Sequence, residues 1–206
     1  MRNCEEVGKN YKSGDWNIRS GRLDSLYGCP EYITGHFICS DNELRTLVGG
    51  PQKVDGGYFS SENRLTDLLG SPKHITTGFH VDTNQLTSLV GGPQRVDGIY
   101  NCYDNQLSDL VGCASHIGDT LNCFSNNITS LVGIHKIIKS CGSIRCSETK
   151  ITEGGIGLLL IDNLVRITSK HEPFQIISKY LGKGTKGMMD CRAELISKGY
   201  SEYAKL

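Results

Sequence analysis

The sequence has no excess of either charge and no long apolar segment. Its 22 lysine and arginine residues are balanced by 22 aspartate and glutamate residues, so no overall field attracts polyanions or anionic membranes. The longest apolar run, residues 156–161, is too short to cross a bilayer, which takes about 20 helical residues. Hydrophobic residues make up only 37% of the chain while 25 residues are glycine, which indicates many tight turns in place of thick helical packing.

Paired cysteine motifs and an export-type leader pattern are also missing. The nine cysteines form no C-x-x-C pair, and the opening residues Met-Arg-Asn-Cys-Glu-Glu-Val have no apolar core of the kind found in signal peptides. Disulfide frameworks belong to oxidising compartments. We therefore expect reduced thiols and a cytoplasmic protein that does not contact a membrane.

What the sequence does have is a repeat of 21 residues. The motif N-x-L-x-x-L-x-G-x-P-x-x-[VI] recurs along the first three quarters of the chain. Its first apolar column consists of Leu23, Leu44, Leu65, Leu86, Leu107 and Ile128. A second leucine, a glycine, a proline, a β-branched residue and an aromatic ring recur in register with this column. So many columns with one spacing identify a tandem repeat.

A 21-residue unit is too small to bury its own apolar face, whereas stacked units turn each column into a ladder through a shared interior. The ring residues alternate with polar residues, as in Phe79-His-Val81, and a period of two is typical of a short strand with one buried face. We therefore predict a solenoid in which each coil adds one strand to a parallel sheet. The seven predicted strands lie near residues 16–18, 37–39, 58–60, 79–81, 100–102, 121–123 and 142–144.

A column of asparagines follows the strands and precedes the first buried leucine by two residues. It consists of Asn42, Asn63, Asn84, Asn105 and Asn126. An unpaired buried amide costs roughly 2–7 kcal/mol, so we expect each side chain to bond the backbone of its own coil and of the neighbouring coil. Cys39, Cys102 and Cys123 share one inward position, where we expect them to fill space as small apolar residues.

The segment Phe79-His-Val-Asp-Thr-Asn-Gln-Leu-Thr-Ser-Leu-Val-Gly-Gly-Pro93 resembles the leucine-rich repeat family. It is similar to the short-repeat bacterial effectors and, more closely, to repeat proteins of large tailed phages, which share the L-x-G-x-P variant. The resemblance implies an α/β leucine-rich-repeat solenoid with a short-strand parallel sheet and irregular return segments. It also implies a non-catalytic scaffold that binds a protein. Ring residues at the first strand position, and Gly21 in place of the first asparagine, depart from the family pattern.

We divide the chain into three parts, because a solenoid exposes its interior at both ends unless it is capped. Residues 1–20 form an N-terminal cap and the first strand, with Trp16 covering the core of the first coil. Residues 21–153 carry the repeats, and the regular stack is expected to end near Ile151. Residues 154–206 form a C-terminal cap.

Helical spacing characterises the C-terminal cap. The first helix is expected to begin at Glu172-Pro173 and to stop at Gly182, because proline suits a first helical turn and glycine ends one. The second helix is expected to end at Gly199, after a tight turn through Gly182–Gly187. Its common apolar side is expected to hold Met188, Cys191, Leu195 and Ile196.

Two alternative functions rest on this cap. Its helices carry basic residues that can contact the phosphates of a nucleic acid, although no interleaved aromatics or DNA-reading helix accompany them. These residues are Lys179, Lys183, Lys186, Arg192 and Lys198. The other alternative is an enzyme module centred on Cys191, as in the ubiquitin-ligase domains of bacterial effectors. Those domains need a long helical region and a C-x-D motif, whereas Cys191 is followed by Arg-Ala-Glu.

Metal and cofactor chemistry also lack a motif. Cys141, Cys146 and His135 form the only sequence cluster of metal-ligating residue types, and their spacing does not match a zinc site. We expect no catalytic residues, no cofactor and no metal.

The strand side chains that point away from the core form the predicted binding face. Its central row reads Asn17, Ile38, Phe59, His80, Asn101, Asn122 and Ser143, and the adjacent row reads Arg19, Ser40, Ser61, Asp82, Tyr103, Phe124 and Arg145. Large apolar residues interrupt the polar alternation in both rows, and Tyr, Phe and Arg are common interface anchors.

We therefore expect a protein partner on this face, a host or defence protein in the host cytoplasm if the phage resemblance holds. The predicted contact residues are Ile38, Phe59, His80, Asn101, Tyr103, Asn122, Phe124 and Arg145. Two alternatives remain open at this point. The rings can pack against one another or against the rim of the sheet, or the face can bind a second copy of the chain.

Overall fold

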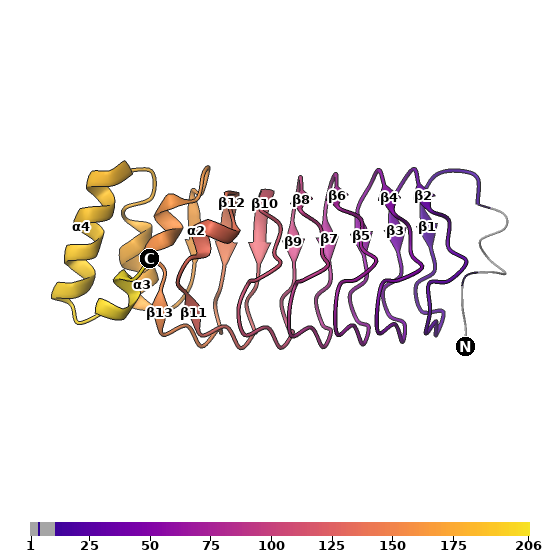
Figure 1. The fold of residues 1–206 in the computed structure, drawn as a ribbon, viewed down its shortest axis with the longest axis horizontal. Helices are drawn as coiled ribbons and strands as arrows, with labels where there is room; N and C mark the ends of the chain where they lie inside the picture. The colour runs from indigo at the N-terminus through magenta and orange to yellow at the C-terminus, as the bar shows by residue number, and fades with distance from the viewer. Residues whose placement is uncertain (1–3, 5–10) are drawn as a thin grey trace.

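The computed structural model describes residue 4 and residues 11–206, and this part of the chain winds into a parallel β-solenoid (Figure 1). About seven turns of about 21 residues stack along one axis to form a rod, and helices lie at its C-terminal end. The predicted fold class, with short parallel strands, irregular return segments and C-terminal helices, is confirmed.

One strand from each coil joins the main sheet, and neighbouring strands are parallel throughout. In spatial order the strands are β1 (Trp16–Asn17), β3 (Phe37–Ile38), β5 (Tyr58–Phe59), β7 (Phe79–His80), β9 (Tyr100–Asn101), β10 (His116–Asn122), β12 (Ser140–Arg145) and β14 (Arg166–Thr168). Phe37 pairs with Trp16 on one side and with Tyr58 on the other, so the columns of the sequence become ladders across the sheet.

The coil lengthens from 21 to 23 residues near the C-terminal end of the sheet. Leu121 pairs with Ile144 and Ile144 pairs with Ile167, each 23 residues later. The single 21-residue period predicts seven strands and an end of the stack near Ile151, and it misses β14. Strand side chains alternate with a period of two, so an insertion of two residues keeps the same side chains facing inward. The ladder therefore continues into an eighth strand.

Shorter strands line a second side of the rod. β2 (Tyr32–Ile33) pairs with β4 (Lys53–Val54), and β6 (His74–Ile75) pairs with β8 (Arg95–Val96), which pairs in turn with β10. Further along, β11 (Ser130–Leu131) pairs with β13 (Glu153–Gly154), and helix α2 (Ile134–Ile137) lies between them in the chain. The inward residue of each early strand is β-branched and buried, as the repeat predicts.

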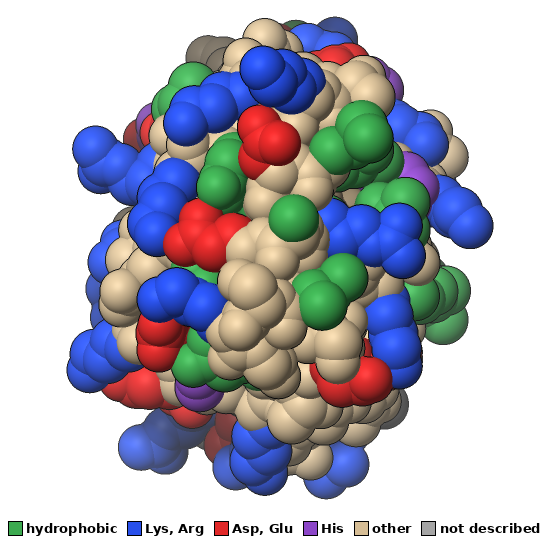
Figure 2. Space-filling model, turned by 90° about the vertical axis from the view of Figure 1, so that its left-hand side faces the viewer, with side chains coloured by type: hydrophobic (Ala, Val, Ile, Leu, Met, Phe, Trp, Pro, Cys, Tyr) green, Lys and Arg blue, Asp and Glu red, His purple; other side chains and the backbone are tan. Residues whose placement is uncertain are grey.

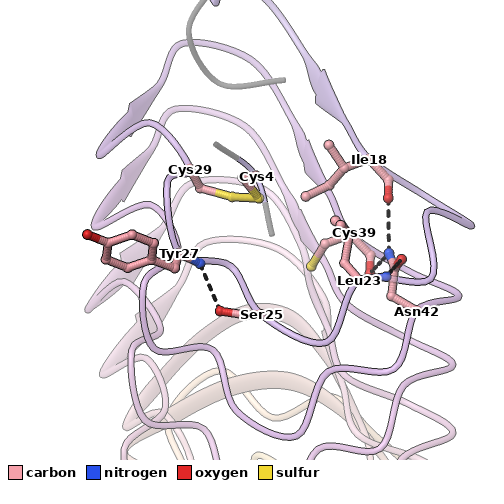
Figure 3. The surroundings of a disulfide bond; sticks show 8 residues. All are labelled: Cys4, Ile18, Leu23, Ser25, Tyr27, Cys29, Cys39 and Asn42. Atoms are coloured by element: carbon pink, nitrogen blue, oxygen red, sulfur yellow. Dashed lines mark hydrogen bonds between the residues drawn. A yellow bond between two sulfur atoms is a disulfide. The ribbon is translucent and has the colours of Figure 1, made fainter. Parts of the chain in front are cut away.

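The asparagine column bonds the backbone as predicted. The Nδ2 atom of Asn63 donates to the carbonyl oxygens of Ser60 (3.2 Å) and Ser61 (3.2 Å) in its own coil and of Cys39 (3.0 Å) in the preceding coil. Its Oδ1 atom accepts from the backbone N–H of Leu44 at 3.0 Å. Asn42 repeats this pattern, and Figure 3 shows its bonds to Ile18, Leu23 and Cys39. Asn84, Asn105 and Asn126 repeat it along the rod.

Tyrosine alternates with phenylalanine in the buried ring ladder, and the hydroxyl group of each tyrosine lies close to a glycine earlier in the same coil. The rings follow one another in the order Phe37, Tyr58, Phe79 and Tyr100, and the centroids of successive rings are 4.8, 5.7 and 5.2 Å apart. A Cβ atom on Gly50 would lie 3.0 Å from the hydroxyl oxygen of Tyr58. Gly92 stands in the same relation to Tyr100, at 3.2 Å. The glycines therefore leave the space that the hydroxyl groups occupy.

The hydroxyl of Tyr58 is buried and has no hydrogen-bond partner within the described part of the chain. A buried hydroxyl without a partner loses its hydration and gains nothing in return. We expect Tyr58→Phe to raise the free energy of unfolding by about 1 kcal/mol in a urea titration. Gly50→Ala, which fills the same space from the other side, is the matched variant and should lower it. A loss of stability in Tyr58→Phe would mean that the hydroxyl has a partner.

The N-terminal end of the rod contains a disulfide between Cys4 and Cys29 (Figure 3). This pair differs from the expectation of reduced thiols, whereas the other seven cysteines are free and buried. Disulfides are typical of oxidising compartments and rare in the cytoplasm, so this pair does not support the expected cytoplasmic location. Trp16 is buried, and the ring of Tyr11 lies edge-on against it at 5.1 Å. Residues 1–3 and 5–10 of the predicted N-terminal cap lie outside the described residues.

At the other end, the chain forms η1 (Ile156–Leu160), α3 (Glu172–Ser178), α4 (Gly184–Ser197) and η2 (Ser201–Ala204). Helix α4 buries Cys191 and Leu195, as predicted, but leaves Ile196 52% exposed. The prediction for Ile196 is wrong because this residue directly follows the buried Leu195, and successive residues point about 100° apart around a helix. No helix of the described residues is long and apolar enough to cross a membrane.

Candidate functional site

The outer face of the main sheet carries one continuous row of side chains, here called the central row. Strand register places it residue by residue as Asn17, Ile38, Phe59, His80, Asn101, Asn122, Arg145 and Thr168. Neighbouring strands of a sheet lie about 4.8 Å apart, so side chains of one row touch across the strands.

Arg145 belongs to this central row and not, as the 21-residue period predicts, to the adjacent row beside Phe124. Its Cα partner is Asn122, and Ser143 pairs with Thr120 instead. The two additional residues of the longer coil shift the register by two, which moves each side chain along the strand without turning it to the other face. Arg145 therefore stays on the outer face, one row away from its predicted place.

Phe59 is the centre of a cluster of stacked rings. It lies face to face with His80 at a centroid distance of 4.8 Å and meets His36 edge-on at 5.6 Å. Burial lowers the pKa of His80 below its ordinary value of 6.5, and the nearby Asp82 opposes this effect. A shallow hollow of about 280 Å³ adjoins the pair, lined mainly by Phe59, His80, Ile99 and the backbone of two glycines.

Tyr103 and Phe124 form a second ring pair, next to the central row. Their rings are nearly parallel, 5° apart in orientation and 4.5 Å apart between centroids. The guanidinium of Arg145 lies 5.8 Å from the centre of the Phe124 ring, at a distance where a cation is attracted by an aromatic face. The negative charge of Asp82 raises the pKa of the Tyr103 hydroxyl.

Polar groups between the two ring pairs are held by side-chain hydrogen bonds. The buried carboxylate of Asp82 accepts from the hydroxyl of Ser61 at 2.7 Å and from Nδ2 of Asn101 at 2.8 Å. Asn101 also lies 3.4 Å from Nδ1 of His80 and is buried itself. Because Ser61 donates to Asp82 and not to His80, these residues do not form the hydroxyl–imidazole pair that activates a serine nucleophile.

The rings of the outer face are less exposed than the sequence suggests. Ile38, Phe59, Tyr103 and Phe124 are all half-buried, because each packs against neighbours on the sheet, and Asn101 is only 9% exposed. Packing of the rings against one another, one of the two alternatives to partner binding, therefore accounts for part of their surface. The part of each ring that stays exposed is held in place by the stacking of Phe59 on His80 and of Tyr103 on Phe124.

A more exposed apolar surface lies on another side of the rod and was missed by the sequence interpretation. This apolar ridge has one residue per coil, between 44% and 63% exposed: Tyr27, Val48, Leu69, Val90, Val111 and Val132. A side chain two positions earlier accepts a hydrogen bond from the ridge N–H in every coil, as Ser25 does for Tyr27 in Figure 3. Such local turns direct the ridge residue outward. The sequence does contain a signal for this ridge, because an apolar residue precedes the glycine of each repeat at the same spacing of 21 residues.

The basic residues of the C-terminal helices are partly neutralised. Lys179 pairs with Glu194 at 2.7 Å and Lys198 pairs with Glu172 at 3.3 Å. Figure 2 shows lysine and arginine side chains distributed around this end of the rod, with acidic and apolar side chains among them. This pattern is unlike the continuous basic stripe of a nucleic-acid-binding surface.

The thiol of Cys191 is also poorly suited to the alternative enzyme role. It is buried, and burial with a nearby Glu194 raises its pKa to about 11, so it is protonated at neutral pH. A protonated thiol is a weak nucleophile. Cys141 donates to the carbonyl of Ser143 at 3.1 Å, and the described residues contain no group of three or more His, Cys, Asp or Glu arranged to hold a metal.

Comparison of the chain with protein families, curated proteins and solved structures finds no match.

Proposed function

We propose that the chain is a non-catalytic scaffold that binds a protein partner on the outer face of its main sheet. The observation that carries the proposal is the pair of fixed ring stacks, Phe59 on His80 and Tyr103 on Phe124, on an open face. Interfaces are enriched in aromatic residues and arginine, and a few such anchors supply most of the binding energy.

Preorganisation favours this face as a binding surface. Ordering a flexible side chain at an interface costs about 0.5–1.5 kcal/mol, and rings that already stack have lost that freedom before the partner arrives. The backbone beneath is equally constrained, because the parallel ladder and the asparagine bonds join each coil to the next. A partner therefore meets a surface that needs little rearrangement.

The kind of partner is proposed from the resemblance to leucine-rich repeat proteins of large tailed phages. Proteins of that family are scaffolds for protein partners, and a phage protein of this kind would engage a host or defence protein in the host cytoplasm. The buried, protonated thiol of Cys191 and the ion pairs of Lys179 and Lys198 favour this function over the enzyme and nucleic-acid alternatives.

The test is a double substitution, Phe59→Asp with Phe124→Asp, in protein immobilised for capture from a bacterial lysate. Both rings are half-buried on the face, so a carboxylate at each site removes the stacks and repels an apolar contact. We expect capture of the partner to fall at least about tenfold, as for loss of an interface anchor. Circular dichroism and urea unfolding check that the variant folds.

The matched control places the same charges on the apolar ridge, with Val48→Asp and Val90→Asp. These residues are 57% and 54% exposed and lie on another side of the rod. Capture should be retained in this variant. The reverse result, with capture lost only in the ridge variant, would move the binding surface to the ridge and overturn the proposal. Capture of the chain itself, seen as a dimer in sedimentation, would identify a second copy as the partner.

A further inference from the structure

A polar hollow of about 420 Å³ lies at the C-terminal end of the outer face. It is lined by Ile99, Thr120, Asn122, Ser143, Arg145, Arg166 and Thr168. Its volume is within the range of about 300–1,000 Å³ that is typical of small-molecule sites. The hollow contains two arginines, three hydroxyl groups and one amide, and no carboxylate is among its lining residues.

Strand geometry builds this hollow from three neighbouring strands. β10, β12 and β14 each contribute two residues that are two positions apart, and such residues project from the same face. In the register of the sheet, Ser143 lies between Thr120 and Arg166, while Arg145 lies between Asn122 and Thr168. The two arginines therefore occupy adjacent strands and neighbouring rows, where their guanidinium groups line one cavity.

No acidic side chain of the described residues neutralises either arginine. Within the described residues, Arg145 and Arg166 take part in no ion pair, and both are exposed. Three arginines of other coils do have an acidic partner: Arg19 pairs with Glu62, Arg64 with Glu43 and Arg95 with Asp97. The hollow is thus a place where two arginines face a cavity that has no carboxylate among its lining residues.

We propose that this hollow binds a small molecule through a phosphate monoester group. Guanidinium groups match phosphate oxygens in charge and in the geometry of their donors, and hydroxyl donors complete such sites. A phosphate monoester carries close to two negative charges at neutral pH, which balances the two arginines.

The hollow also has room for the group that bears the phosphate. It meets the shallow apolar hollow beside Phe59 and His80 at Ile99, which lines both. An aromatic or aliphatic group attached to the phosphate can therefore lie against Ile99. This inference goes beyond the proposed partner and does not depend on it, because the ligand is held by the isolated chain.

The test measures binding of inorganic phosphate and of phenyl phosphate to the full chain by calorimetry at low salt. Both should bind, and phenyl phosphate should bind more tightly because its ring gains the apolar contact. Arg145→Gln and Arg166→Gln should each weaken binding at least about tenfold, which corresponds to loss of a charge-assisted hydrogen bond. Added sodium chloride should weaken binding further by screening.

Arg192→Gln is the matched control. Arg192 is an exposed arginine on α4 that takes part in no ion pair among the described residues and lies outside the hollow. Its substitution should leave phosphate binding unchanged. Equal losses of affinity in all three variants would indicate general attraction to basic residues and overturn the proposal. The proposal would also be overturned if neither inorganic phosphate nor phenyl phosphate bound to the chain. Equal affinity for the two probes would identify a site for free phosphate and contradict a monoester ligand.

Urea unfolding of the two hollow variants shows whether a loss of binding reflects a loss of the fold. Both arginines are exposed and take part in no ion pair among the described residues, so Arg166→Gln should change stability by less than about 0.5 kcal/mol. Arg145→Gln also loses the contact with the Phe124 ring and should cost at most about 1 kcal/mol. The partner test uses Phe59 and Phe124 and a different readout, so either proposal can fail while the other stands.

Discussion

Asn126→Ala is expected to destabilise the solenoid by about 2–4 kcal/mol, because a single side chain satisfies four buried backbone groups. Nδ2 of Asn126 donates to the carbonyl oxygens of Cys102, Cys123 and Phe124 at 3.0–3.2 Å, and Oδ1 accepts from the N–H of Leu107 at 3.0 Å. Alanine leaves these groups without a partner in a site too buried for bulk water. The measurement is the free energy of unfolding in urea.

The next residue provides a matched control. Asn127 is exposed, and its amide oxygen accepts a hydrogen bond from the Nζ atom of the surface residue Lys150, at 3.0 Å. Asn127→Ala should change the free energy of unfolding by less than about 0.5 kcal/mol, as surface substitutions usually do. Similar losses in the two variants would show that the asparagine column has no special structural role.

Gly70→Ala should destabilise the protein by about 3 kcal/mol or more, for two additive reasons. The residue has φ of +92°, where a side chain is strained, and an added Cβ atom would lie 2.4 Å from the carbonyl oxygen of Leu47 in the preceding coil. Neither the strain nor the contact can relax easily, because the opposing atom belongs to the backbone of a stacked turn. Thermal and urea unfolding both measure the effect.

Gly182→Ala separates the two causes. Gly182 also has a positive φ, +71°, but an added Cβ atom would meet nothing within 4 Å. We expect a loss of only about 1 kcal/mol, the cost of the left-handed conformation alone. If both variants lose the same amount, the close approach of neighbouring coils does not limit the glycine column.

The asparagine column shows why so much of the fold could be predicted. In a solenoid, each coil contacts only its neighbours, so the position of a residue within the repeat determines its face, its burial and its partners. The bonds of Asn63 to its own and the preceding coil follow from that rule. The same rule fails beyond Leu121, where the coil lengthens and β14 lies outside the 21-residue pattern.

The candidate site was less predictable, because the period does not describe how side chains of different coils meet. The sequence places Phe59 and Phe124 on the outer face but does not reveal that each ring is half-buried by a neighbour. It also does not indicate that Arg166 joins Arg145 at one hollow, since that contact depends on the 23-residue coils.

The sequence by itself determined the solenoid, the inward ladders and the asparagine bonds, since equal spacing along the chain becomes direct contact when identical turns stack. Only the tertiary structure decided which outward side chains are exposed, which charges remain unpaired and where the surface is hollow. Those properties depend on register shifts and on contacts between unlike residues in neighbouring coils. A repeat gives the position of each residue within its coil, but it specifies neither the register shifts nor these contacts.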